Sequence, residues 1–286
     1  MVASEQLKRL VDRIPDPDPD GRYAHLDLQQ AHRINKVVDE LGRKVCQSVS
    51  GLVALLTQPG QNTDVKARFA LHLLAVYVTQ KKNAAARSEF VETVVSQLGT
   101  DLPKAVQAYL IEQLQLSGTK AAVQALGKAL LDPELCDTAA RALVSIGDGA
   151  AEQLLAALPK LQGRSRVSVL QKLAKLRTPQ AKEAFRRALG DHDPEARIAA
   201  AWGLARLADA QAAQLLLKSA DSGQGWERIN QTDACLTLAE TLAAAGNPKD
   251  AAAIYAHLVN TRTDPSERHV RAAAQRGLAV VKRASG

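Results

Sequence analysis

The feature that most constrains this chain is a helical pattern that returns after about 30 residues. Residues 132–148, DPELCDTAARALVSIGD, and 193–209, DPEARIAAAWGLARLAD, both begin Asp-Pro-Glu, place Ala and Leu at matching positions and end in Asp. GRSRVSVLQKLAKLRT at 163–178 keeps the apolar spacing, and DPSERHVRAAAQRGLAVV at 264–281 repeats it with two extra residues. Such periods are typical of solenoids, in which each unit buries its apolar face against its neighbours.

Helix start and stop signals divide the repeating part into seven predicted helical hairpins. Each second helix has an Asp, Thr or Gly near its start and a Gly, Asn or Asp soon after its end, as helix capping requires. Aromatic residues make up only 3% of the chain against 46% apolar residues overall, so Ala, Leu and Val must build the core. The expected bounds are about 43–80, 83–117, 119–147, 149–177, 179–208, 210–246 and 247–284.

The second helices resemble those of the HEAT-like repeats first associated with phycobilin lyases, which read D-P-x-V-R-x-x-A-x-x-A-L-G. The similarity covers roughly residues 61–284. It implies an all-α fold, an α-α superhelix of the HEAT/armadillo-like solenoid type with about seven hairpins. Tetratricopeptide repeats are the nearest alternative, suggested by AAAGNPKDAAAIYAHLVN at 243–260. Their period of about 34 residues is not sustained along the chain.

Two domains are predicted: N-terminal helices with an acidic linker at 1–42, and the repeat solenoid at 43–286. The linker DPDPDGRYAHLD has the acid spacing of an EF-hand loop, with Asp16, Asp18, Asp20 and Asp27 as calcium ligands. Against calcium, Pro19 stands where such loops take positive φ. The interpretation we favour is a stiff spacer, because prolines extend the backbone and aspartates repel one another. This spacer is expected to hold the first helix apart from the repeats.

Asp and Arg recur four residues apart at helix starts, as in the pairs Asp64 with Arg68 and Asp193 with Arg197. The aspartate is expected to cap the first amides and to pair with the arginine. Arg166 and Arg271 occupy the same arginine position. We interpret these residues as a structural ladder and not as ligand-binding groups.

The second helices of a solenoid line its concave face, so their solvent-facing positions are the predicted binding surface. Two positions one turn apart hold the pairs Asp137 and Arg141, Val167 and Gln171, Ile198 and Trp202, Leu236 and Glu240, and Ala272 and Arg276. Trp is the natural anchor, because it is enriched among residues that carry binding energy. The alternative is that Trp202 belongs to the core. The predicted partner-binding residues are Arg141, Val167, Gln171, Lys172, Lys175, Ile198, Trp202, Arg206, Leu236 and Arg276.

A basic stretch at 159–177 accompanies this surface, with six cations and no acid. On a helical wheel Ser168, Gln171, Lys172 and Lys175 share one face. That face is either simply solvated or contacts an acidic protein segment or a phosphate backbone. Trp226, expected in a long turn, either covers one end of the groove or packs its own loop.

The function predicted from these features is a non-enzymatic scaffold that holds a protein or peptide, in particular an acidic one, on the concave face. The alternative is a nucleic-acid binding or modifying protein with a basic concave face, since some HEAT-like proteins grip DNA in this way. The formal charge of +7 is modest for that role. No nucleotide-binding, hydrolase or zinc motif is present, so no enzyme activity, cofactor or metal is predicted. A bilin lyase activity would rest on fold analogy alone.

The cysteines and the hydropathy of the chain indicate in which cellular compartment it is expected. Cys46, Cys136 and Cys235 lack metal or disulfide spacing and are expected to be buried thiols. The absence of a long apolar run argues against a membrane, and the first residues predict an amphipathic helix instead of a secretory signal. A cytoplasmic protein is therefore expected.

Overall fold

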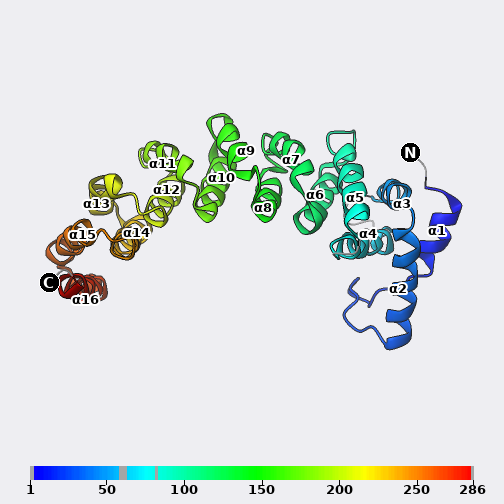
Figure 1. Ribbon diagram of the computed structural model, residues 1–286, viewed down its shortest axis with the longest axis horizontal. Coiled ribbons are helices and arrows are strands. Elements are labelled where there is room, and N and C mark those ends of the chain that lie inside the picture. The colour runs from blue at the N-terminus through cyan, green and yellow to red at the C-terminus, as the bar shows by residue number, and fades with distance from the viewer. Residues whose placement is uncertain (1–2, 58–62, 81–82, 285–286) are drawn as a thin grey trace. The chain divides into compact units, whose positions relative to one another are not determined.

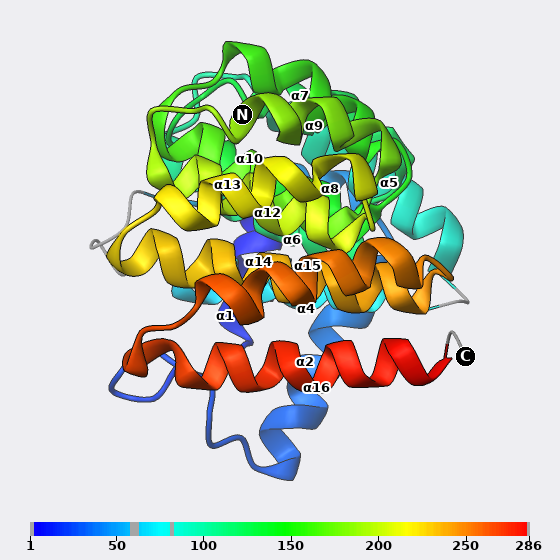
Figure 2. The same ribbon diagram turned by 90° about the vertical axis from the view of Figure 1, so that its left-hand side faces the viewer.

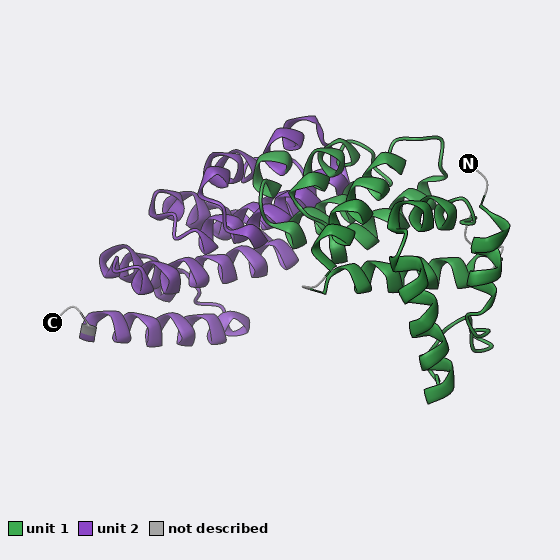
Figure 3. Cartoon of the chain, turned by 45° about the vertical axis from the view of Figure 1, so that its right-hand side comes forward, with its two compact units in different colours: residues 1–153 green, residues 154–286 purple. Residues whose placement is uncertain are grey.

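The computed structural model describes residues 3–57, 63–80 and 83–284, and every regular element in these ranges is a helix. The all-α prediction is confirmed. Gln61, where the sequence pattern places the start of the repeat resemblance, lies outside the described residues. The chain forms two compact units, residues 1–153 and 154–286 (Figure 3).

The first unit opens with two helices and continues with helical hairpins. Its α-helices are α1 (Glu5–Asp12), α2 (Leu28–Gly42), α3 (Val45–Val53), α4 (Val65–Val78), α5 (Ala84–Gln97), α6 (Lys104–Ser117), α7 (Val123–Ala129) and α8 (Cys136–Ile146). A 3-10 turn at Lys120–Ala122 precedes α7. In this unit α4 packs on α6 and α6 packs on α8, so the second helices of successive hairpins lie side by side.

The second unit consists of further hairpins of the same kind. Its helices are α10 (Gly163–Leu176), α11 (Lys182–Ala188), α12 (Pro194–Arg206), α13 (Ala213–Ser222), α14 (Gly225–Ala244), α15 (Pro248–Thr261) and α16 (Arg268–Ala284), while α9 (Ala150–Ala157) spans the boundary. Short 3-10 turns precede α10, α11, α13 and α16. Taken with the first unit, the helix bounds confirm all seven predicted hairpins, from α3 with α4 to α15 with α16.

Helices of the second unit lie in two rows. Figure 1 shows α11, α13 and α15 in an outer row and α10, α12, α14 and α16 in an inner row. Figure 2 shows α13 to α16 running across the view side by side. The inner row is continuous, because α10 packs on α12, α12 on α14 and α14 on α16. Second helices therefore line one face, as the repeat pattern predicts.

Small side chains allow this close packing. In α12 eight residues are buried, and five of them are alanines. A helix flanked by neighbours on two sides and by its hairpin partner on a third has little solvent-facing surface, and alanine combines close approach with the best helix propensity.

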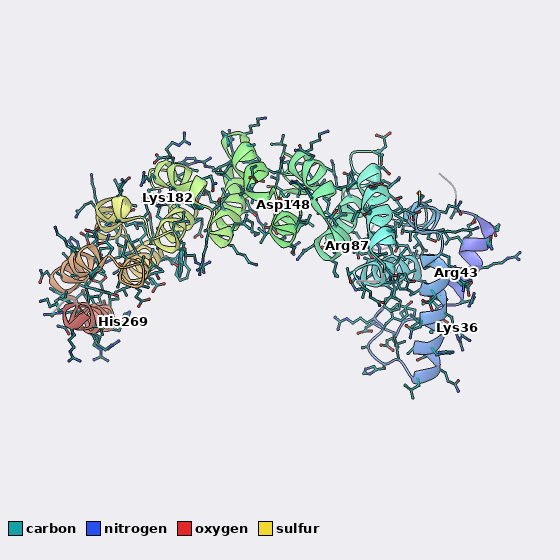
Figure 4. All side chains as sticks on the ribbon, in the orientation of Figure 1. Lys36, Arg43, Arg87, Asp148, Lys182 and His269 are labelled. Carbon is teal, nitrogen blue, oxygen red and sulfur yellow. The ribbon has the colours of Figure 1, made fainter. Side chains whose placement is uncertain are left out.

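Helix ends follow the sequence signals only in part, because α4, α10 and α14 begin without a side-chain cap. Asp193 accepts a hydrogen bond at 2.9 Å from the amide of Glu195 at the start of α12. After α10 and α12, Arg177 (φ 51°) and Ala208 (φ 48°) adopt the left-handed conformation that ends a helix, without being glycine. In the first unit Arg87 donates to the carbonyls of Ser117 and Gly118 at the end of α6 (Figure 4).

Two hairpins of the second unit seat an aromatic ring over a glycine. A Cβ on Gly203 of α12 would stand 2.5 Å from ring carbons of Phe185, which is fully buried in α11. Gly277 of α16 faces Tyr255 of α15 in the same way, at 2.4 Å. The rings of Phe185 and Tyr255 thus depend on glycine for space.

The first helix does not stand apart from the repeats, which corrects the predicted role of the spacer. α1 contacts α3 and α4, and Leu7, Val11 and Ile14 are buried. Leu7 fills the space over Gly51, where a Cβ would lie 2.3 Å from its Cδ2. The apolar stripe of an amphipathic helix is stabilised by packing, and the segment after α1 is bent enough to allow it. The domain boundary after residue 42 stays a prediction.

The aspartates of the calcium hypothesis have separate local tasks. Asp16 pairs with Lys66 of α4 at 2.7 Å. Asp18 accepts a hydrogen bond from the amide of Ala24 at 3.0 Å. Asp27 caps α2 in a reciprocal capping box. Among the residues that the structure describes, no three His, Cys, Asp or Glu side chains gather closely enough to hold a metal.

The three thiols do not share one environment. Cys136 and Cys235 are buried, as the sequence predicts, but Cys46 is exposed in the first turn of α3, which corrects the prediction. Burial raises the pKa of the Cys235 thiol to about 12. Because the thiolate is the reactive form, Cys235 is inert at neutral pH.

The contact between Gly203 and Phe185 makes a stability prediction. Gly203→Ala forces the ring to move inside a packed hairpin and is expected to lower the free energy of unfolding by about 1–3 kcal/mol, despite the better helix propensity of alanine. Urea unfolding followed by circular dichroism measures it. Gly190→Ala is the matched control, because only the carbonyl of Arg187, at 3.6 Å, faces a Cβ there. Equal effects of the two substitutions would contradict the packing described here.

Candidate functional site

An arginine stands fourth in five of the second helices. These residues are Arg68 of α4, Arg166 of α10, Arg197 of α12, Arg228 of α14 and Arg271 of α16. The sequence pattern finds four of them and misses Arg228. The fourth position marks a common register, so side chains can be compared from helix to helix.

In the second unit these arginines bridge successive hairpins. Arg197 binds both carboxylate oxygens of Glu227 in α14, with one contact at 2.6 Å. Arg228 likewise binds Glu267, in the turn before α16, at 2.8 and 2.9 Å. Arg166 donates to Asp191 at 2.8 Å. Each arginine therefore joins its own hairpin to the next one by a charge-assisted hydrogen bond.

The same arginines also close the first helix of their own hairpin. Arg166 donates to the carbonyl of Leu158 at 3.2 Å. Arg197 donates to the carbonyls of Asp191 and His192, and Arg228 to those of residues 220 and 221. Helix ends leave carbonyls without intrahelical partners, and the guanidinium supplies the missing donors. The structural interpretation of these arginines is thus supported by two kinds of contact.

One predicted pair is wrong. Arg68 does bind Asp64, at 2.9 Å, although Asp64 does not cap α4 as expected. Arg197 binds Glu227 and not Asp193. Asp193 uses its carboxylate for the helix cap instead. A capping carboxylate points at the first amides, so the arginine is free to reach the bidentate acceptor on the neighbouring helix.

The acceptors of this ladder are held as carboxylates. The hydrogen bond from Arg197 lowers the pKa of Glu227 below its usual range, and the hydrogen bond from Arg228 does the same to Glu267. Partial burial acts in the opposite direction at both residues and is the smaller effect.

The arginine register corrects the predicted surface in α14. Gln-Gly-x-x-Arg occurs at 162–166 and again at 224–228, and Gly163 and Gly225 share a positive φ of 48° and 51°. α14 therefore begins at Gly225, in the segment that the sequence analysis assigns to a turn. Ile229, and not Leu236, matches Ile198. Repeated Gln-Gly-x-x-Arg is the signal that finds it, and the absence of Asp-Pro-Glu in this repeat is what hides it.

The fifth position of the inner helices is unevenly exposed. Ile229 of α14 is 63% exposed, and Trp226, one turn earlier, is 66% exposed. Val167 of α10 is half-buried, whereas Ile198 of α12 is 8% exposed and belongs to the core, contrary to the prediction. α12 has an inner-row neighbour on each side, α10 and α14. Trp226 and Ile229 therefore form an exposed apolar pair on α14, the helix next to α12 in the row.

The ninth position carries the predicted anchor. Trp202 of α12 is half-buried, and the guanidinium of Arg206 lies 5.4 Å from the centre of its ring. At the same position stand Gln171 of α10, Asp233 of α14 and Arg276 of α16, all exposed. Trp202 is thus neither fully buried nor free. One face of its ring is taken by Arg206.

The other predicted site residues are distributed along the row. Lys175 of α10 is exposed, Lys172 and Leu236 are half-buried, and Ser168 is buried at 7% exposure, which corrects its expected place on a solvated face. Arg141 of α8 lies in the first unit, where it pairs with Asp137 at 3.3 Å.

A polar cluster around the buried Arg262 lies between α13, α14 and α15. Arg262 is 1% exposed and donates to Asp221 at 2.6 Å, while Asp221 also bonds His257 at 2.7 Å. Partial burial alone would raise the pKa of Asp221, but the hydrogen bonds from Arg262 and His257 outweigh it and lower that pKa. The cluster ties three helices together and offers no nucleophile, since the nearby Cys235 is protonated.

Comparison with known proteins gives a family match over part of the chain and two remote structural likenesses. The family of HEAT repeats matches residues 151–237, which confirms HEAT-like repeats in this chain. An engineered protein of known crystal structure is 20% identical, with a TM-score of 0.46, over 96% of this chain and 78% of that one. The complex of CpcE and CpcF of phycocyanin lyase from Nostoc sp. is 19% identical, with a TM-score of 0.41, over 82% and 94%. Both scores lie below 0.5, so neither likeness bears on function.

No curated protein matches the sequence. None of the helices described above is long and apolar enough to cross a membrane.

The ladder makes a prediction about pH. Arg197→Gln leaves Glu227 partly buried without its partner and is expected to lower the free energy of unfolding by about 2 kcal/mol at pH 7. The folded pKa of Glu227 is depressed, so the pair stabilises the fold above the ordinary glutamate pKa of about 4.3 and loses this effect as the pH falls through the folded pKa.

A double-mutant cycle with Glu227→Gln, followed by urea unfolding, measures this pair. A coupling of about 1–3 kcal/mol is expected at pH 7, shrinking below pH ~4. A coupling that is absent at pH 7, or unchanged at low pH, would refute the ion-pair description.

Proposed function

We propose that this chain is a non-enzymatic scaffold that binds a protein or peptide partner on the inner row of its second unit. The exposed pair Trp226 and Ile229 carries the proposal, because both side chains are about two-thirds exposed on a helix that otherwise packs against its neighbours. Large apolar side chains in such positions are typical of interaction surfaces. Covering them with a partner removes this apolar area from water.

Trp202 extends the surface to the adjoining helix. α12 packs on α14, and the ring of Trp202 is half-buried with Arg206 against it. Aromatic and arginine side chains are the commonest carriers of binding energy at interfaces. The proposed contact surface therefore runs from Val167, Gln171 and Lys175 of α10 through Trp202 and Arg206 to Trp226 and Ile229, with Leu236 and Arg276 further along the row.

Charge on the row favours a partner with acidic residues near α10. The stretch 159–177 holds six cations and no acid, while α14 contributes the exposed acids Asp233 and Glu240. Attraction and repulsion along one row fix the direction in which a partner lies. No residue of this surface is assigned a catalytic role.

Photo-crosslinking tests the proposal. A benzophenone amino acid at Ile229 is expected to form a specific adduct with the partner in cells. The same residue at Leu215, an exposed apolar position of outer-row α13, is the matched control. Once the captured protein is identified and purified, Ile229→Glu and Trp202→Ala should each weaken its binding at least ~10-fold, as hot-spot substitutions do.

Because Ile229 is exposed, its substitution should change the free energy of unfolding by no more than ~0.5 kcal/mol. Unchanged affinity of Ile229→Glu, or equal crosslinking from both positions, would contradict the proposed surface.

A second candidate function is nucleic-acid binding, and α16 is the observation that favours it. This helix contains five Lys and Arg residues and no acid, and Arg268, Arg271 and Arg276 are exposed. Together with the cations of α10 they would neutralise phosphates.

Fluorescence anisotropy with labelled duplex DNA, measured at salt concentrations from about 50 to 200 mM, separates the two functions. Proteins that bind several phosphates lose about 10³–10⁵-fold in affinity over this range. The scaffold proposal predicts weak binding without sequence preference. Submicromolar affinity that falls steeply with salt and is lost in Arg271→Glu with Arg276→Glu would favour nucleic acid instead.

A further inference from the structure

The chain already places one acidic segment on a second helix. Residues 15–27, between α1 and α2, run beside α4 of the first unit (Figure 1). The carboxylate of Asp16 pairs with Lys66 at 2.7 Å. The ring of Tyr23 stacks on that of Phe69, with centroids 3.8 Å apart and planes 11° from parallel. One ion pair and one aromatic contact thus fasten this segment to α4.

Local hydrogen bonds shape the segment for these two contacts. The amide of Asp18 donates to the carbonyl of Arg22 at 2.7 Å, and the amide of Gly21 donates to the carbonyl of Asp18 at 2.7 Å. Gly21 has a φ of 77°, which glycine adopts without strain. The turn brings Asp16 and Tyr23 to the same helix. Cover by α4 raises the pKa of Tyr23 to about 12, chiefly through loss of water.

The contact positions on α4 recur on α10. Lys66 and Phe69 are the second and fifth residues of α4, and Arg164 and Val167 are the second and fifth of α10. Residues three apart lie on one face of a helix. The fourth residue is an arginine in both helices, and in both it is engaged by an aspartate. The two helices therefore present a cation and an apolar side chain in the same register.

On α10 this pair faces no acidic segment in the part of the chain that the structure describes. Arg164 is exposed and Val167 is half-buried. The other inner helices of the second unit lack the combination: α12 has Glu195 and the buried Ile198, α14 has Trp226 and Ile229, and α16 has His269 and Ala272. A cation next to an apolar position makes α10 the place on this row that suits a carboxylate followed by an aromatic ring.

We propose that α10 binds an extended acidic segment of the partner, with a carboxylate on Arg164 and an aromatic side chain on Val167, as residues 16–23 bind α4. The proposal deepens the proposed function and rests on it for the assumption that the inner row is a binding surface. The aromatic residue follows the carboxylate by seven positions, as Tyr23 follows Asp16. The rest of the partner then continues toward Trp202 on the adjoining helix α12.

A peptide of the chain's own residues 15–27 is the probe. In the full-length protein the corresponding segment already covers α4, so a fluorescein-labelled copy added in excess reports the open position on α10. Saturable binding is expected by fluorescence anisotropy. Arg164→Glu and Val167→Glu should each weaken it at least ~10-fold, and raising the salt should weaken it as well.

Matched controls separate the site from general charge attraction. Lys218→Glu changes an exposed cation of outer-row α13 and should leave the affinity unchanged. A scrambled peptide of the same composition, and peptides with Asp16→Asn or Tyr23→Ala, should bind at least ~10-fold more weakly than the original.

Several outcomes would overturn the proposal. These are the absence of peptide binding, equal binding of the scrambled peptide, and binding that is insensitive to both α10 substitutions. A loss of binding in Phe69→Ala with no loss in Val167→Glu would place the added peptide on α4 and would also overturn it. Crosslinking of a partner from Ile229 is an independent measurement, so the proposed function can stand where this assignment of the ligand fails.

Discussion

Side-by-side packing of second helices is the constraint on which the rest of the structure depends. In the second unit each inner helix has a neighbour along the row and a hairpin partner behind it. α12 meets this demand with alanines and a glycine that receives the ring of Phe185. Most of α12 is buried, so only its few accessible side chains, among them Trp202, can contact a partner.

Electrostatic contacts set how the hairpins register against one another. An arginine at a constant position donates to carbonyls of its own hairpin and to a carboxylate of the next one. One side chain therefore fixes contacts within and between hairpins. Apolar packing between smooth, alanine-rich surfaces does not fix this register strongly, whereas a bidentate ion pair does. The ladder in turn places the fifth and ninth positions on a common face, and the candidate binding surface is a consequence of it.

The hairpins were predictable because their signals are local. Asp-Pro at a helix start acts within one turn, and the repeating period reinforces it. Contacts between hairpins were not predictable in the same way. Arg197 pairs with Glu227, which is 30 residues away in sequence. The burial of Ile198 depends on the packing of α12 between α10 and α14. The register of α14 was missed because Gly225 replaces the usual Asp-Pro start.

Stability in the second unit is shared between neighbours. Arg166, Arg197 and Arg228 link the fourth hairpin to the fifth, the fifth to the sixth and the sixth to the seventh. When one hairpin melts, the adjoining one loses its carboxylate acceptor or its guanidinium donor, so the cost of a boundary between folded and unfolded repeats includes a stranded charge. The unit therefore resembles a one-dimensional lattice with strong nearest-neighbour coupling, in which partly melted states are rare and the terminal hairpins fray first.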